Sequence, residues 1–341
     1  MFHIRTVSLA TLLIALFFLQ SCTSTDEVNI YSSRHYETDL ELYSQFTERT
    51  GVNINLIEGG SDELIARMLS EGVNSPADIL ITVDAGRLWR AQEAGVLQPI
   101  QSDLIDSRVP EELREPNGYW VGLSQRVRAV IYNRSAVDPE ELGGYMDLAD
   151  SKWRGRICVR SSNNIYNQSL VASMIEQFGE EETERWATDL VANFARPPQG
   201  GDTDQIRAVA AGQCDIALAN QYYLARLADS SDRADTDVAE AVGIWFPSSA
   251  SGGAHVNISG AGLTKHAPNR ENAIKFLEYL TERESQMLFA GGNYEYPVYG
   301  DIDLPEVLQQ FGPFDTDAVN VAVYGENNPD AIRLMDRAGW R

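Results

Sequence analysis

Short apolar segments alternate with amphipathic segments along most of the chain, and this alternation constrains the fold more than any other feature. Residues 28–31, 52–57 and 77–82 have the length and apolar content of buried strands. Between them, apolar residues recur at helical spacing before Gly51 and after Ser61, and we expect Ser61 to cap the second helix. Strand, helix and strand in succession predict an α/β unit with a mainly parallel sheet.

The second half of the chain repeats this pattern. Strands are expected over residues 129–132, 157–159 and 215–219, and helices over 169–178, 204–211 and 272–289. The polar, acidic segment 228–240 is expected to form an exposed loop. A chain of 341 residues is longer than one hydrophobic core usually serves. The sequence therefore predicts an α/β protein with two lobes and a cleft between two mainly parallel sheets.

The lobes are expected to be joined by strands that cross near residues 121–128 and 257–263. Lobe 1 would then hold residues 28–122 plus 258–300, and lobe 2 would hold residues 123–257 plus 301–341.

The N-terminus has the features of an export signal. The apolar run 9–19 has about eleven residues, whereas a membrane-spanning helix needs ~20. Residues 19–22 read Leu-Gln-Ser-Cys and resemble the lipobox of bacterial lipoproteins, in which Cys22 would carry the lipid. We therefore expect a signal peptide over residues 1–21 and a polar tether over 22–27; secretion with another cleavage point is the alternative.

Two further cysteines, Cys158 and Cys214, lie in apolar segments with the character of strands. In an oxidising compartment such a pair can form a disulfide, and two buried free thiols in neighbouring strands are the alternative.

The charge of the chain disfavours nucleic acid as a partner. The formal net charge is −23 and the isoelectric point is near 4.5. Binding to a phosphate backbone needs the opposite sign.

Tyrosines follow three of the expected strands at the end where ligands bind in open parallel sheets. Tyr36 comes shortly after the first strand, next to His35. Tyr166 follows the strand 157–159, and the adjacent pair Tyr222 and Tyr223 follows the strand 215–219. Adjacent residues point apart on a helix or strand. We therefore expect that Tyr222 and Tyr223 can both face one site only if they lie in a turn.

A cluster of phenols suits a small cation of high charge. The free phenol has a pKa of about 10, so a metal must displace its proton, and a trivalent ion does so most readily. Softer metals prefer thiolates or several imidazoles, and calcium and magnesium prefer carboxylates and carbonyls. Ferric iron fits these donors best. For any single tyrosine, packing with the hydroxyl in water is the alternative.

Five segments resemble the periplasmic ferric-iron-binding proteins of ABC transporters, in particular their cyanobacterial-type group. They are residues 31–36 (YSSRHY), 76–79 (PADI), 122–128 (GLSQRVR), 165–168 (IYNQ) and 220–226 (NQYYLAR). The resemblance extends in order from about residue 28 to about residue 299. It implies a two-lobed type II binding-protein fold in the periplasm, monomeric, with ferric iron as cargo for an ABC transporter permease.

The same resemblance implies the residues of the site. The implied iron ligands are His35, Tyr36, Tyr166, Tyr222 and Tyr223, with Arg126 and Arg226 hydrogen-bonded to the phenolates and Arg34 as a weaker candidate. Another branch of the family uses one His, one Glu and two Tyr with an anion such as carbonate. Here that Glu is missing, with Asp84 near its position, and Tyr36 and Tyr166 would make up the donors, so binding without an obligatory anion is expected.

Two other functions are compatible with parts of the sequence. The same fold could bind an organic or oxyanion cargo such as thiamine, sulfate or a polyamine, with stacking on Tyr36 or Tyr166. A secreted hydrolase is disfavoured because His255 and His266 have no nucleophile motif nearby. We therefore expect no enzymatic activity.

Overall fold

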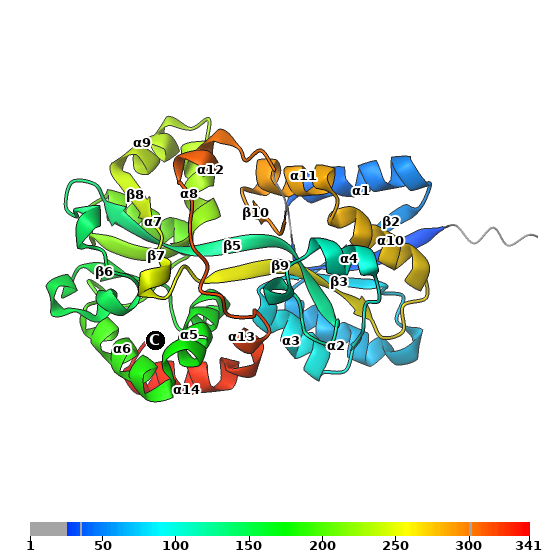
Figure 1. The fold of residues 1–341 in the computed structure, drawn as a ribbon, viewed down its shortest axis with the longest axis horizontal. Coiled ribbons are helices and arrows are strands. Elements are labelled where there is room, and N and C mark those ends of the chain that lie inside the picture. Colours follow the sequence, from blue (N-terminus) through cyan, green and yellow to red (C-terminus); the bar gives the residue numbers. More distant parts are fainter. Residues whose placement is uncertain (1–25, 35, 300–301) are drawn as a thin grey trace, which may run out of the picture.

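The computed structural model describes residues 26–34, 36–299 and 302–341. The expected signal peptide, the lipidation candidate Cys22 and the ligand candidate His35 lie outside these described residues. Two α/β lobes lie side by side, and long strands run between them (Figure 1).

The strands form one continuous path in the order β2-β1-β3-β9-β5-β7-β6. On one side of this path are β1 (Glu27–Ser32), β2 (Asn53–Glu58), β3 (Ile79–Val83), β4 (Leu97–Gln98), β9 (Val256–Thr264) and β10 (Tyr296–Pro297). On the other side are β6 (Ile157–Cys158), β7 (Ile216–Asn220) and β8 (Val242–Trp245). The 14-residue strand β5 (Trp120–Asn133) belongs to both sheets.

β5 joins the lobes because its two halves have different partners. Its first half pairs with β9, from Trp120 opposite Gly262 to Val127 opposite Val256. Its second half pairs with β7 and β8. A single strand therefore carries the backbone from one sheet into the other, and it passes through the centre of the molecule (Figure 1).

The sheets are mixed, and the expectation of mainly parallel sheets holds for only part of each. β1 is parallel to β2 and β3, and β6 is parallel to β7. The crossing strands β5 and β9 run in opposite directions because the chain leaves lobe 1 on one and returns on the other. They therefore pair antiparallel with each other and with their other neighbours.

Helices cover both sheets. Those beside the sheet of β1 are α1 (Glu37–Thr50), α2 (Ser61–Glu71), α3 (Ala85–Glu93), α4 (Asp103–Arg108), α10 (Arg270–Leu280) and α11 (Arg283–Asn293). Those of the second lobe are α5 (Ile165–Phe178), α6 (Glu180–Ala192), α7 (Asp202–Ala210), α8 (Gln221–Ala228), α9 (Arg233–Ala241), α12 (Glu306–Gln310) and α14 (Asn328–Ala338). The short helix α13 (Val323–Glu326) packs against both α3 and α5, so it contacts both lobes.

Three local expectations were wrong. The segment 228–240, expected to be a loop, contains α9, whose first turn is capped by the Asp232 carboxylate accepting from the Ala234 amide at 2.9 Å. The single helix expected over 272–289 is two helices, α10 and α11, divided at Thr281. Gly60 rather than Ser61 is the N-cap residue of α2, and the Glu63 carboxylate accepts from its amide at 3.1 Å.

In the part of the chain that the structure describes, no helix is both long and apolar enough to cross a membrane.

Candidate metal centre

The four candidate tyrosines lie at the starts of three helices, each following a strand. Tyr36 is the N-cap residue of α1, after β1. Tyr166 lies in the first turn of α5, after β6. Tyr222 and Tyr223 lie in the first turn of α8, directly after β7. The strand ends therefore deliver these side chains as the sequence pattern predicted.

The phenols converge. The Tyr222 hydroxyl is 3.5 Å from the Tyr166 hydroxyl, and the rings of Tyr222 and Tyr223 lie with centroids 4.3 Å apart. Tyr36 joins the group through Arg126, which contacts the hydroxyls of both Tyr36 and Tyr166. We expected Tyr222 and Tyr223 to face one site only if they lay in a turn. This expectation was wrong, because both residues belong to α8 and their rings pack against each other.

Arg126 is the centre of this cluster. Its side chain is buried in β5, the strand shared by the two sheets. Nη2 donates to the Tyr36 hydroxyl at 2.7 Å and Nη1 to the Tyr166 hydroxyl at 3.3 Å, while the guanidinium carbon lies 4.6 Å from the Tyr222 ring centroid. One cation therefore contacts phenols that come from three different helices.

The phenols differ in how readily they lose a proton. Burial raises the pKa of Tyr222 well above its ordinary value, and the neighbouring phenols add to this effect although Arg126 opposes it. Burial likewise raises the pKa of Tyr223 to about 12. Burial also opposes ionisation of Tyr166, but the charge of Arg126 and the hydrogen bond from Tyr222 outweigh it and lower the pKa of Tyr166. Of these three phenols, Tyr166 is thus the one that loses its proton most readily.

Comparison with known proteins places the chain among transport proteins. Residues 74–313 match the family model for bacterial extracellular solute-binding proteins. The chain belongs to this family. The solute-binding protein is 51% identical to iron uptake protein A1 of Synechocystis over 92% of its own length and 88% of that protein.

Solved structures agree with this assignment. An iron- and citrate-bound Trichodesmium protein (IdiA, FutA) superposes with a TM-score of 0.90 at 57% identity, covering 92% of this chain and all of that one. The ferric binding protein of Campylobacter jejuni superposes with a TM-score of 0.86 at 37% identity, covering 92% of this chain and 100% of that one. The expected two-lobed fold of a solute-binding protein is confirmed.

The other two arginines singled out from the sequence contact the phenol rings. Arg226 of the solute-binding protein lies 4.8 Å from the Tyr36 ring centroid and 4.9 Å from that of Tyr222, so it stacks as a cation on aromatic faces. Arg34 lies 4.7 Å from the Tyr36 ring centroid, and its guanidinium pairs with the carboxylates of Asp39 and Glu295. Both arginines add positive charge beside the phenols.

Glu295 belongs to the same cluster, and the sequence did not reveal it. Its carboxylate is fully buried and pairs with Arg126 at 3.1 Å and with Arg34 at 2.9 Å. Burial opposes ionisation, but the two guanidinium groups dominate and hold the pKa of Glu295 at about 2. No local motif marks this residue, because it lies 169 positions from Arg126 in the sequence.

Asp84, the position compared with the Glu of the other branch, is occupied by structural contacts. It has a positive φ of 79° and caps α3, where Oδ1 accepts from the Gly86 amide at 2.9 Å. The same oxygen accepts from Ser169 at 2.7 Å, and Oδ2 accepts from Asn257 at 2.9 Å. Both carboxylate oxygens therefore already have hydrogen-bond donors.

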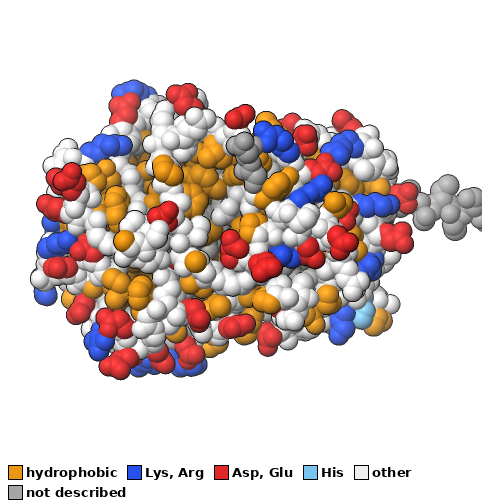
Figure 2. Space-filling view, viewed as in Figure 1, with side chains coloured by type: hydrophobic (Ala, Val, Ile, Leu, Met, Phe, Trp, Pro, Cys, Tyr) orange, Lys and Arg blue, Asp and Glu red, His pale blue; other side chains and the backbone are white. Residues whose placement is uncertain are grey.

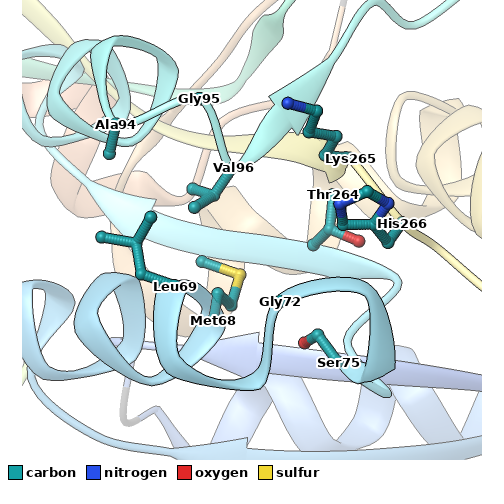
Figure 3. Close-up of a pocket in the computed structure, with 10 residues that line it drawn as sticks. All are labelled: Met68, Leu69, Gly72, Ser75, Ala94, Gly95, Val96, Thr264, Lys265 and His266. Carbon is teal, nitrogen blue, oxygen red and sulfur yellow. The ribbon is translucent and has the colours of Figure 1, made fainter.

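A separate hollow in the described part of the first lobe is lined by no tyrosine. A pocket of about 230 Å³ lies between the end of α2, the end of α3 and the residues after β9 (Figure 3). Its lining includes the apolar side chains of Met68, Leu69 and Val96, with Lys265 and His266 at one side.

Acidic side chains are spread over both lobes on the face in Figure 2, so the net negative charge is not concentrated at one patch there.

Cys158 and Cys214 form a disulfide. Of the two alternatives that the sequence allowed, a disulfide or two buried free thiols, the structure has the first. The bond lies in the second lobe, where it links the end of β6 to the residues just before β7.

Proposed function

We propose that this protein captures ferric iron in the tyrosine cluster and delivers it to the permease of an ABC importer. The observation that carries the proposal is the convergence of four phenols from three helix starts around Arg126. Its relatives, iron uptake protein A1 of Synechocystis and the ferric binding protein of Campylobacter jejuni, support the same cargo. Those names describe binding and uptake, and we expect no enzymatic activity.

We assign Tyr36, Tyr166, Tyr222 and Tyr223 as the iron ligands, with His35 retained as a predicted fifth. Phenolate oxygens are hard anionic donors, and three of them would cancel the charge of a ferric ion. A fourth would leave a net negative centre, which Arg126 and Arg226 would offset. The saturated contacts of Asp84 support binding without an obligatory anion.

Capture would close the two lobes around the ion. We propose the lobe bounds 28–122 plus 258–300 and 123–257 plus 301–341, with β5 and β9 as the hinge. The contacts between these lobes beside the cluster include those in which Ser169 donates to Asp84 and the Tyr294 hydroxyl donates to Asp229. Opening at the permease would break such contacts and release the ion.

We further propose that the chain is exported as a monomer and held at the membrane through Cys22. The apolar run 9–19 and the lipobox-like residues 19–22 support this proposal. A relative in Serratia marcescens is described as a periplasmic protein. Metabolic labelling with a fatty acid, with and without Cys22→Ala, tests the anchor: the variant should lose the label.

Titration of the purified mature protein with a ferric chelate tests the proposed cargo. Tyrosinate bound to ferric iron absorbs visible light, so the solution should turn orange-red and reach a plateau at one iron per protein. Thiamine, sulfate and polyamines serve as competing cargoes in a thermal-shift assay. A colourless titration with stabilisation by one of these would replace iron with that cargo.

Iron binding should strengthen steeply as pH rises. The pKa values of Tyr222 and Tyr223 are raised, so both phenols are protonated near neutral pH and must lose their protons to bind iron. Each displaced proton adds about one logarithmic unit of affinity per pH unit, so the expected slope is about two or more. Competition against a chelator of known pH dependence between pH 6 and 8 measures it. A flat profile would mean that these phenols do not bind the ion.

A further inference from the structure

We propose that Glu295 is a positioning residue for iron capture, which holds Arg126 so that it reaches Tyr36 and Tyr166 at the same time. The inference rests on the proposed function and adds to the site a carboxylate that does not bind iron itself.

Glu295 is held by four donors. Oε1 accepts from Arg126 Nε at 3.1 Å. Oε2 accepts from Arg34 Nη1 at 2.9 Å, from Ser259 at 3.0 Å and from Ser124. A buried carboxylate is costly unless it is paired and hydrogen-bonded, and here both oxygens are engaged. Such complete pairing fixes the position of the carboxylate.

Three of these four donors come from the strands that connect the lobes. Ser124 and Arg126 lie on β5 and Ser259 lies on β9, the two strands of the proposed hinge. The register of β5 against β9 shifts between Gly122 and Ser124, so the carboxylate lies beside an irregularity in this pairing. Glu295 thereby ties the hinge strands to Arg34, two residues before Tyr36.

The geometry of the Arg126 guanidinium explains how Glu295 acts on Tyr36 and Tyr166. Arginine presents its donors in a rigid plane, so a partner on one edge orients the others. With Nε fixed on Glu295, Nη1 and Nη2 point to Tyr166 and Tyr36. Glu295 also neutralises part of the positive charge of Arg126. Without it, Arg126 would be free to pair more closely with the phenolates and compete with the cation for their oxygens.

The variant Glu295→Gln tests this role, because it keeps the shape and removes the charge. We expect it to bind iron with the tyrosinate colour but to release iron to excess citrate at least about tenfold faster, with the midpoint of acid-induced release at higher pH. Asp39→Asn is the matched control, since Asp39 pairs with Arg34 at 2.8 Å but not with Arg126. The control should release iron within about twofold of wild type.

A double-mutant cycle tests whether Glu295 acts on iron release through Arg126. In an Arg126→Gln background, Glu295→Gln should change the release rate by less than about twofold, because the group through which it acts is gone. If Glu295→Gln does not fold, Glu295→Asp is measured in its place; the shorter carboxylate keeps the charge but not the reach to both arginines.

Three results would overturn the inference: a wild-type release rate in the Glu295 variant, an equal change in Asp39→Asn, or an undiminished change without Arg126. A wild-type protein without iron colour would instead refute the proposed cargo.

Discussion

Replacing Tyr222 with phenylalanine is expected to weaken ferric iron binding at least about a hundredfold, or roughly 2.7 kcal/mol. The side chain is fully buried, so the substituted ring occupies the same space but offers the cation no donor. Folding should be little affected, because the hydrogen bond from Tyr222 to Tyr166 is long at 3.5 Å. The loss should therefore appear in iron affinity and in visible absorbance, with the thermal unfolding of the iron-free protein nearly unchanged.

Tyr324→Phe is the matched control for this experiment. Tyr324 is also fully buried, and its hydroxyl donates to the Val256 carbonyl at 2.8 Å. Its loss should lower stability by about 1 kcal/mol and leave the iron spectrum intact. Competition with citrate, followed in the visible spectrum, compares the variants. If Tyr222→Phe held iron as tightly as wild type, the ligand assignment would be wrong.

Removing the disulfide should lower the free energy of unfolding by about 4 kcal/mol. Cys158 and Cys214 are 56 positions apart, and a cross-link of that span restricts the unfolded chain by about this amount in the chain-entropy model. Denaturant unfolding of a Cys158→Ala, Cys214→Ala double variant measures the change, in a chain that also carries Cys22→Ala so that no other thiol interferes. Iron affinity should change little, because neither cysteine belongs to the cluster. An unchanged midpoint would show that the bond does not restrain the unfolded chain.

The positions of the tyrosines could be predicted because they depend on local order in the sequence. Strands are recognisable as short apolar runs, and the residue after a strand end is known once the strand is. Tyr36, Tyr166, Tyr222 and Tyr223 were found in this way. The type of local structure was harder: α9 was missed because its helical pattern is short and polar, and its capping residue Asp232 lies in an acidic segment.

Glu295 could not be found from sequence because its role depends entirely on contacts between distant residues. Its partners Arg34 and Ser124 lie 261 and 171 positions away. For the same reason, Arg226 was expected to donate to phenolates, whereas it stacks on their rings. The sequence reveals which groups can bind a cation, and the fold decides which charges orient them.

Metal content and the visible spectrum of the mature protein, purified from iron-replete cells, test the central claim most directly. The proposed site predicts about one iron per chain and an orange-red band from tyrosinate bound to ferric iron, both absent after acid stripping and restored by ferric citrate. A colourless protein that carries no iron and takes up none from ferric citrate would contradict the account.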